Sequence, residues 1–225
     1  MKFIHASVLF FGLLHCAVAA EKLPKVLIIA DGIHRSTAKT AAAELQGRVD
    51  VVVPESDLGD TGAAIELLGE VLGESQWDLI YFNFGFADLR HIDPKTKAVR
   101  VMSRHAGGKR VTSPQKYQAN LEKIVTRLKD TGAKLIWASS TPLVGTKYDG
   151  VYESGSEIEY NTIAAEIMQR ENIAINDMHA WVLQNVKKFT DSFSFRRIPI
   201  HEPMVESIEK ALVLSGKKSA DEKQK

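Results

Sequence analysis

The chain alternates short apolar runs with longer amphipathic segments, and this alternation restricts its fold more than any other feature. Five apolar runs have the length and composition of buried strands, at residues 25–30, 49–53, 77–84, 133–142 and 173–177. The segments between and after them carry apolar residues at helical spacing. Strands joined by helices of this length pair in parallel, and the helices cover both faces of the sheet. The pattern predicts one α/β domain, a three-layer α/β/α arrangement around a five-stranded parallel sheet.

Several helix ends are marked by their residue types. Ser113 is a typical N-cap for the clearest helix, Pro114 suits its first turn, and Gly132 suits its end. In the helical segment that comes after the first apolar run, Ser36 or Thr37 is expected to cap the first turn. These signals predict helices that begin just beyond the strands, as the alternating pattern requires.

The first 20 residues differ in character from the rest of the chain. A single lysine precedes an apolar stretch, which ends in the small residues "AVAA". This is the pattern of a secretory signal peptide, with cleavage expected after Ala19 or Ala20. The apolar run is short and contains His15, which argues against a permanent membrane helix. A membrane anchor on the same segment, or a lipid on Cys16, is the alternative.

Cleavage would leave about 205 residues, enough for a single domain over 21–215 with its own core, and a charged tail at 216–225 is expected to be disordered. The whole chain has 29 basic and 28 acidic residues, and the leader contributes one lysine and no acid. This balance argues against a nucleic-acid partner, and against membrane binding after cleavage. Cys16 is the only cysteine, so the mature chain would have no disulfide or thiol nucleophile. We expect a secreted or periplasmic protein.

Other sequence patterns do not predict a cofactor or a metal. Residues 89–112 are polar, basic and contain glycine, so they indicate a loop or a small hairpin. The Gly-Gly-Lys within this segment lacks the spacing of a phosphate-binding loop and does not come directly after a strand. The histidines beyond the leader have no zinc-type spacing and no cysteine partners.

Four segments, in order, resemble the blocks of the SGNH (GDSL-type) hydrolases, and in particular their secreted bacterial branch. They are "VLIIADGI", "PESDLGDTGAAIELL", "WDLIYFNFGFADL" and "TDSFSF". The resemblance spans residues 25–213 and implies a flavodoxin-like fold and descent from ester hydrolases, often acting on acetylated carbohydrates. The family mechanism implies a serine nucleophile in the first block and a histidine base in the last, with an aspartate three residues before it. It also implies an oxyanion site built from backbone N–H groups and an asparagine.

At the positions of the reactive groups, the resemblance places residues that cannot do this chemistry. Gly32 stands at the nucleophile position, Ser194 at the base position and Ala87 at the asparagine position. Glycine and alanine lack the needed groups, and a hydroxyl is not a general base near neutral pH. The framework residues that match the family are Asp31, Gly59, Gly85, Asp88 and Asp191. Of these, Asp31, Gly59, Gly85 and Asp88, together with Gly32, are the expected ligand-binding positions.

Substitute groups lie near these blocks, and each also has an ordinary structural explanation. Ser36 and His201 could form a relocated pair, although Ser36 also suits a helix N-cap and His201 the start of the last helix. His34 is interpreted as a solvated turn residue, and Phe86 as a residue that could line a pocket. Asp191, without its histidine, would bind either backbone N–H groups or a ligand.

The sequence supports three functional hypotheses. The first is a secreted pseudoenzyme that binds or scaffolds, with a carbohydrate or acylated glycan as the ligand implied by the resemblance, and with no cofactor. The alternative is an active ester hydrolase that uses Ser36 and His201. The third is a structural or partner-binding envelope protein, which a filled strand-end region would favour.

Overall fold

The structure is a computed structural model that describes residues 22–96, 100–143, 149–185 and 198–213. The predicted leader and tail lie outside the described residues, and so do Asp191 and Ser194. The expectations for these residues therefore stay predictions.

A five-stranded parallel sheet forms the centre of the domain, as predicted. Its strands stand in the order β2-β1-β3-β6-β7, with every neighbouring pair parallel. Their bounds are β1 Lys25–Ile29, β2 Asp50–Val52, β3 Leu79–Phe82, β6 Lys134–Ala138 and β7 Ala174–Asn176. All four residues of β3 are buried, as expected of a central strand that is covered on both faces.

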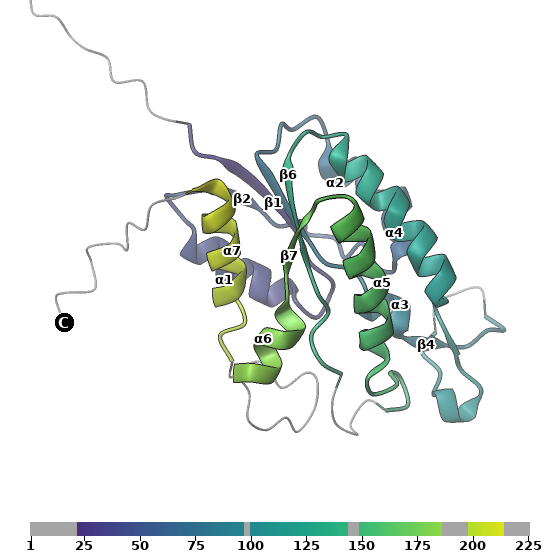
Figure 1. Cartoon of the computed structure of the whole chain (residues 1–225). Helices are drawn as coiled ribbons and strands as arrows, with labels where there is room; N and C mark the ends of the chain where they lie inside the picture. The colour runs from purple at the N-terminus through teal and green to yellow at the C-terminus, as the bar shows by residue number, and fades with distance from the viewer. Residues whose placement is uncertain (1–21, 97–99, 144–148, 186–197, 214–225) are drawn as a thin grey trace, which may run out of the picture.

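Helices cover both faces of the sheet and give the three layers seen in Figure 1. One face carries α2 (Thr61–Leu72), α4 (Pro114–Lys129) and α5 (Ser156–Arg170), and the other carries α1 (Arg35–Glu44), α6 (Met178–Asn185) and α7 (Glu202–Leu212). Each layer encloses its own apolar cluster: Leu27 and Phe82 belong to the first, and Val26 and Tyr81 to the second. Each such buried side chain contributes about 1.5–3 kcal/mol, so the two clusters hold the sheet in place.

The predicted start of the helix at Ser113 is confirmed. Ser113 Oγ accepts a hydrogen bond from the Lys116 N–H at 3.3 Å, and Pro114 is the first residue of α4. The prediction for α1 is wrong in detail, because its N-cap is His34 and Ser36 already lies in the first turn. His34 makes no side-chain cap bond to this helix. Its imidazole instead contacts Asp31 and Thr141.

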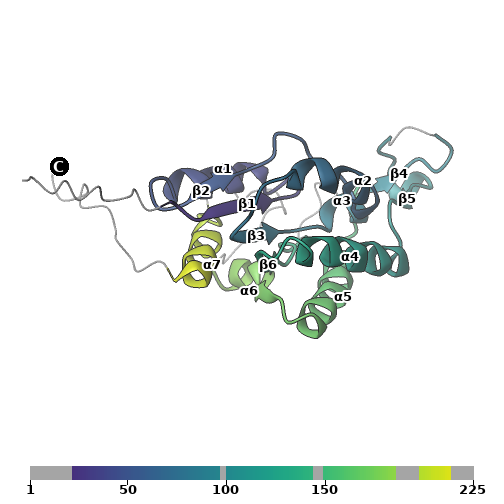
Figure 2. The ribbon, with the colours of Figure 1, turned by 90° about the horizontal axis from the view of Figure 1, so that it is seen from above.

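The connection after β3 is more structured than the sequence predicts. The strand ends at Phe82, and a short helix, α3 (Phe86–Leu89), comes next. The predicted loop or small hairpin contains the antiparallel pair β4 (His91–Ile92) and β5 (Lys109–Arg110), with a 3-10 turn between them. Figures 1 and 2 both show this hairpin at the periphery, far from β1 and β2. The residues nearest the carboxyl ends of the central strands are therefore those of α3 and of the turns after β1 and β6.

Candidate functional site

The turn after β1 holds Gly32 on the surface, and the side chain of Asp57 occupies the space beside it. A Cβ atom placed on Gly32 would lie 2.6 Å from Asp57 Oδ2. The other carboxylate oxygen, Oδ1, accepts a hydrogen bond from the Gly59 N–H at 2.9 Å. The carboxylate of Asp57, an exposed residue, therefore lies against the position where a nucleophilic side chain would begin, and it also accepts a hydrogen bond from Gly59, one of the expected ligand-binding positions.

Two residues of this turn, Asp31 and His34, form a buried chain of hydrogen bonds with Thr141. Asp31 Oδ1 lies 3.0 Å from His34 Nδ1, and His34 Nε2 lies 3.1 Å from Thr141 Oγ1. Asp31 Oδ1 also accepts the backbone N–H groups of Ile33 and His34, both at 3.0 Å. With a neutral imidazole, Nδ1–H donates to the carboxylate and Nε2 accepts from the hydroxyl. The order acid, imidazole, hydroxyl is that of a hydrolase relay.

The burial of this chain indicates a structural role. Thr141 has an exposed fraction of 0 % and His34 of 5 %, so the hydroxyl does not reach a substrate in this conformation. The interpretation of His34 as a solvated turn residue is therefore wrong. The Asp-x-x-His spacing of residues 31–34 is the signal that could have found it, since a carboxylate three residues before a histidine can reach its ring. The chain fixes the turn after β1 to the segment after β6.

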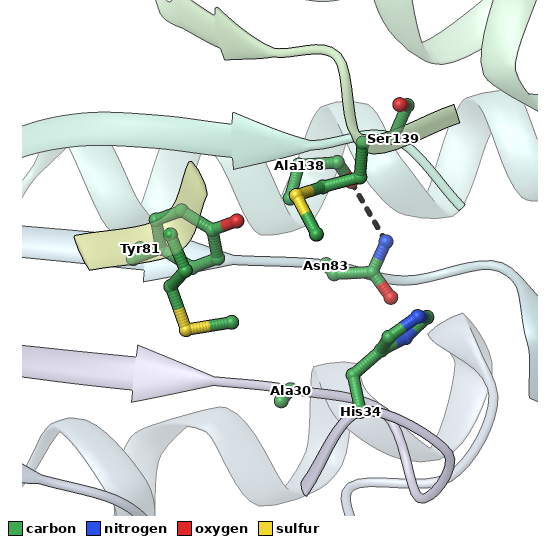
Figure 3. Close-up of a pocket in the computed structure, with 8 residues that line it drawn as sticks. Ala30, His34, Tyr81, Asn83, Ala138 and Ser139 are labelled. Atoms are coloured by element: carbon green, nitrogen blue, oxygen red, sulfur yellow. Dashed lines mark hydrogen bonds between the residues drawn. The ribbon is translucent and has the colours of Figure 1, made fainter. Parts of the chain in front are cut away.

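On the other side of His34 lies a small hollow, shown in Figure 3. It is about 10 Å³, room for about one water molecule. Asn83 Nδ2 donates to the Ala138 carbonyl oxygen at 2.7 Å across it, which ties the ends of β3 and β6 together. The hollow is too small for an organic ligand. The packing between β1, β3 and β6 is thus nearly complete at this edge.

Asp88, an expected binding residue, is buried and links two helices. Its carboxylate accepts from the Thr61 N–H at 3.1 Å and from Thr61 Oγ1 at 2.6 Å, at the start of α2. Asn120 of α4 donates to the same Thr61 hydroxyl at 3.1 Å. Burial raises the pKa of Asp88 to about 6, although the hydrogen bonds from Thr61 oppose the rise. Ala87 is half-buried beside it. In this arrangement Asp88 holds α3 against α2.

Gly85 and Phe86 complete the closed part of the edge. A Cβ atom on Gly85 would lie 2.5 Å from Ser140 Oγ, so glycine permits the close approach of the segment after β6. Phe86, which was expected to line a pocket, is only 1 % exposed and belongs to the core, and it lines neither the hollow at His34 nor the larger cavity described below. Its ring lies 5.5 Å from that of His34 and meets Tyr152 edge-on at 6.2 Å. The physical reason is α3, which turns Phe86 inward.

The proposed substitutes Ser36 and His201 are at opposite ends of α1. Ser36 is exposed in the first turn, whereas His201 Nε2 lies 3.4 Å from a carboxylate oxygen of Glu44, the last residue of the helix. Eight residues of α-helix correspond to about 12 Å. Among the described residues, no hydrogen bond joins the Ser36 hydroxyl to His201.

The carboxyl ends of the parallel strands form one edge of the sheet, and the part of this edge beyond β6 and β7 contains a cavity. A cavity of about 220 Å³ lies between α5, β7 and α6. Its polar walls include Ser139, Asp177 and His179. Ser139 Oγ donates to Asp177 Oδ1 at 3.0 Å, and His179 Nε2 lies 3.3 Å from Glu157 Oε1. Sequence reasoning did not select these residues, although Asp177 and His179 come directly after a strand, at the edge where α/β folds place their functional groups.

The described part of the chain shows neither a metal centre nor a membrane span. Its histidine and acidic residues form no group of three or more that could hold a metal ion. None of its helices is long and apolar enough to cross a bilayer.

Comparison with known proteins identifies the fold. No family model and no curated protein matches the sequence. Among solved structures, a lipase/acylhydrolase from Enterococcus faecalis aligns with a TM-score of 0.64 and 13 % identity, covering 88 % of this chain and 100 % of that one. A GDSL-like lipase from Bacteroides thetaiotaomicron gives 0.59 and 13 %, with coverages of 87 % and 94 %. An acetylxylan esterase from Geobacillus stearothermophilus gives 0.57 and 13 %, with coverages of 85 % and 95 %.

These alignments extend over nearly the whole of each domain. The chain therefore has the SGNH hydrolase fold, as the sequence blocks predicted. At this level of identity the likeness concerns the fold alone, and the function has to be argued from the site.

Proposed function

We propose that the chain is an exported, non-hydrolytic protein that uses the fold of an ester hydrolase to bind a carbohydrate or acylated glycan. The observation that carries this proposal is the position of the Asp57 carboxylate. It lies beside Gly32, where the nucleophile would stand, and it accepts the Gly59 N–H. Export is inferred from the leader-like residues 1–20.

The chemistry of ester hydrolysis supports this interpretation of the site. An oxyanion forms on the substrate in the transition state and needs donors aimed at it. At this edge a carboxylate already holds one donor, and its negative charge would repel the oxyanion. Gly32 offers no nucleophile and Ala87 offers no amide. Removal of single triad members already lowers hydrolase rates by orders of magnitude.

The carbohydrate part of the proposal rests on the comparisons. Two of the aligned structures are described as an acetyl xylan esterase and an acetylxylan esterase. A chain of this fold that has lost the reactive groups could keep affinity for the glycan. We therefore choose acetylated and deacetylated xylan oligosaccharides as first ligands.

One preparation of the chain tests both parts. Hydrolysis of p-nitrophenyl acetate and acetylated xylan is compared with a heat-denatured control, and the same protein is applied to a glycan-binding screen. We expect no turnover above the control and retention of at least one glycan. Turnover that is lost in Ser36→Ala would instead establish the displaced site predicted as the alternative, and binding of no glycan would refute the binding role.

The Asp31–His34–Thr141 chain supports a second candidate, an esterase whose hydroxyl is Thr141. The two hydrogen bonds of 3.0 and 3.1 Å favour it, while the complete burial of Thr141 opposes it. Thr141→Val removes the hydroxyl and keeps the shape of the side chain. We expect the same background rate in this variant as in the parent. A measurable rate in the parent that disappears in Thr141→Val would establish the second candidate.

A further inference from the structure

The cavity between α5, β7 and α6 has a polar side whose hydrogen-bonding capacity is only partly used. Asp177 Oδ1 accepts from Ser139 Oγ and from the Ala180 N–H, both at 3.0 Å. Within the described part of the chain, its Oδ2 has no hydrogen bond. His179 is held by Glu157 through Nε2, while no hydrogen bond to its Nδ1 is found among the described residues. Asp177 Oδ2 is an acceptor, and so is His179 Nδ1 when the imidazole is neutral and Nε2 carries the proton.

The fixed positions of these groups suggest a prepared site. Asp177 stands at the end of β7, directly before α6, and His179 is the second residue of that helix. The His179 backbone N–H donates to Ser139 Oγ at 2.9 Å, so the two residues and Ser139 form one connected cluster. Glu157 is buried, with its side chain 2 % exposed, and it holds the His179 ring, whose side chain is 20 % exposed. Fixed side chains lower the entropy cost of binding.

The remaining walls of the cavity are mostly apolar, although Asn161 and Thr162 of α5 also line it. Trp137, Ile158 and Ile175 line it, and the last two are 56 % and 39 % exposed. A ligand that covers these exposed isoleucines removes apolar surface from water, which favours binding. Trp137 also has a buried indole N–H that lacks a hydrogen-bond partner in the described part of the chain. A ligand for this cavity therefore needs apolar C–H surface and hydrogen-bonding groups on the same small body.

The volume of the cavity and the charges around it restrict the chemical class of its ligand. Cavities for drug-sized ligands are about 300–1,000 Å³, so a cavity of about 220 Å³ suits a body no larger than a single ring. The carboxylates of Asp177 and Glu157 disfavour an anion. No lysine or arginine of the described residues lines the walls. Hydroxyl groups match the site, because they donate to the carboxylate of Asp177 and to Nδ1 of a neutral His179 ring.

We propose that this cavity binds one uncharged sugar ring, with adjacent hydroxyl groups on Asp177 and His179 and the C–H surface against Ile158 and Ile175. The site lies beyond β6 and β7, away from Gly32. It goes beyond the proposed function, because it assigns binding to residues outside the position of the lost nucleophile. It would remain valid even if the chain proved to hydrolyse esters.

Solution NMR of the full chain tests the proposal, with methyl β-xyloside and methyl β-glucoside as probes and acetate and ethanolamine as charged controls. We expect saturable shifts at the amides of Ser139, Ile175 and His179 with at least one glycoside, and no saturable shifts with acetate. Saturation with neither glycoside, or with ethanolamine alone, would overturn the proposal. Ester hydrolysis, measured separately, reports on the other end of the edge and does not affect this outcome.

Variants connect the shifts to the cavity. Asp177→Asn keeps the side-chain cap at the start of α6 and removes the charged acceptor, so we expect binding at least tenfold weaker. Ala165→Leu extends the apolar wall into the cavity and should abolish binding without touching the polar groups. Glu166→Gln, an exposed change on the same helix, is the matched control and should bind as the parent does. Unchanged binding in a folded Ala165→Leu variant would place the sugar elsewhere and refute the assignment.

Discussion

Two ends of one sheet edge differ in how the chain fills them. Beyond β1 and β3, the Asp57 carboxylate lies beside Gly32, and His34, Phe86 and Asp88 are buried. Beyond β6 and β7, a cavity of about 220 Å³ remains, with the half-buried residue His179 on its wall. Both ends are built from turns that come after parallel strands.

The difference shows that the carboxyl ends of the strands can still offer space for a ligand, but beyond β6 and β7 and not beyond β1 and β3. At the closed end, buried side chains bond to one another in the Asp31–His34–Thr141 chain, although Asp31 Oδ2 and Asn83 Oδ1 have no hydrogen-bond partner among the described residues. At the open end, Asp177 and His179 each have one atom without a hydrogen bond within the described residues. The first arrangement stabilises the domain, and the second is available to a ligand.

The largest effect is expected from Phe86→Ala at the closed end. Truncation of a fully buried phenylalanine leaves a cavity and costs about 3–5 kcal/mol of the free energy of unfolding. Here it would also remove the contacts with the rings of His34 and Tyr152. Urea unfolding at neutral pH measures the loss. A cost below about 1 kcal/mol would mean that this end of the edge is not closed.

Asp88→Asn should change how stability depends on pH. The pKa of Asp88 is raised from 3.8 to about 6 by burial, so the folded state binds the proton more tightly than the unfolded state. This group is therefore most compatible with folding below pH 3.8, and its unfavourable ionisation weakens the fold as pH rises through about 6. Over that window the parent should lose about 3 kcal/mol relative to Asp88→Asn.

Urea unfolding of both proteins at several pH values between these limits tests the shift. The expected result is a difference in unfolding free energy that grows with pH and then levels off above neutrality. Parallel pH profiles for the two proteins would contradict the buried, ionisable role of Asp88.

His34→Ala should cost about 1–3 kcal/mol, because it leaves the Thr141 hydroxyl and one bond of Asp31 unpaired in a buried place. His201→Ala is the matched control. His201 is partly exposed and contacts an exposed glutamate, so its removal should change stability by about 0–1 kcal/mol. Thermal unfolding of both variants gives the comparison. Equal costs would show that burial of the imidazole does not distinguish the two histidines.

The smallest effect is expected at the open end, from Ile158→Ser. Ile158 is 56 % exposed, so its replacement should change the free energy of unfolding by about 0.5 kcal/mol or less. The same variant should weaken glycoside binding in the NMR titration, since it removes apolar wall. A destabilisation comparable to that of Phe86→Ala would show that Ile158 belongs to the core.

The layers could be predicted because strand and helix periodicities are local. The buried run at residues 25–30 contains β1, and Ser113 and Pro114 mark the start of α4 correctly. Parallel pairing could be inferred from the lengths of the connections. The resemblance of the four blocks, in order, indicated the fold that the solved structures confirm.

The site could be predicted less well, because it depends on contacts between distant segments. The sequence makes His34 look solvated, since nothing local shows that Thr141 lies beside its ring, 107 residues further along the chain. The approach of Asp57 to Gly32 is likewise a tertiary contact. The cavity at Asp177 and His179 requires α5 and α6 to be placed on either side of β7, which no single segment encodes.

The position of Trp137 has a practical consequence for spectroscopy. The chain has three tryptophans, and Trp137, which is 1 % exposed, lines the cavity beyond β6 and β7. Its indole lies in an apolar, water-poor environment, so its emission should occur at short wavelengths and change when the cavity fills. The protein thus carries its own optical reporter at the open end of the edge, and ligands can be ranked by fluorescence without any label.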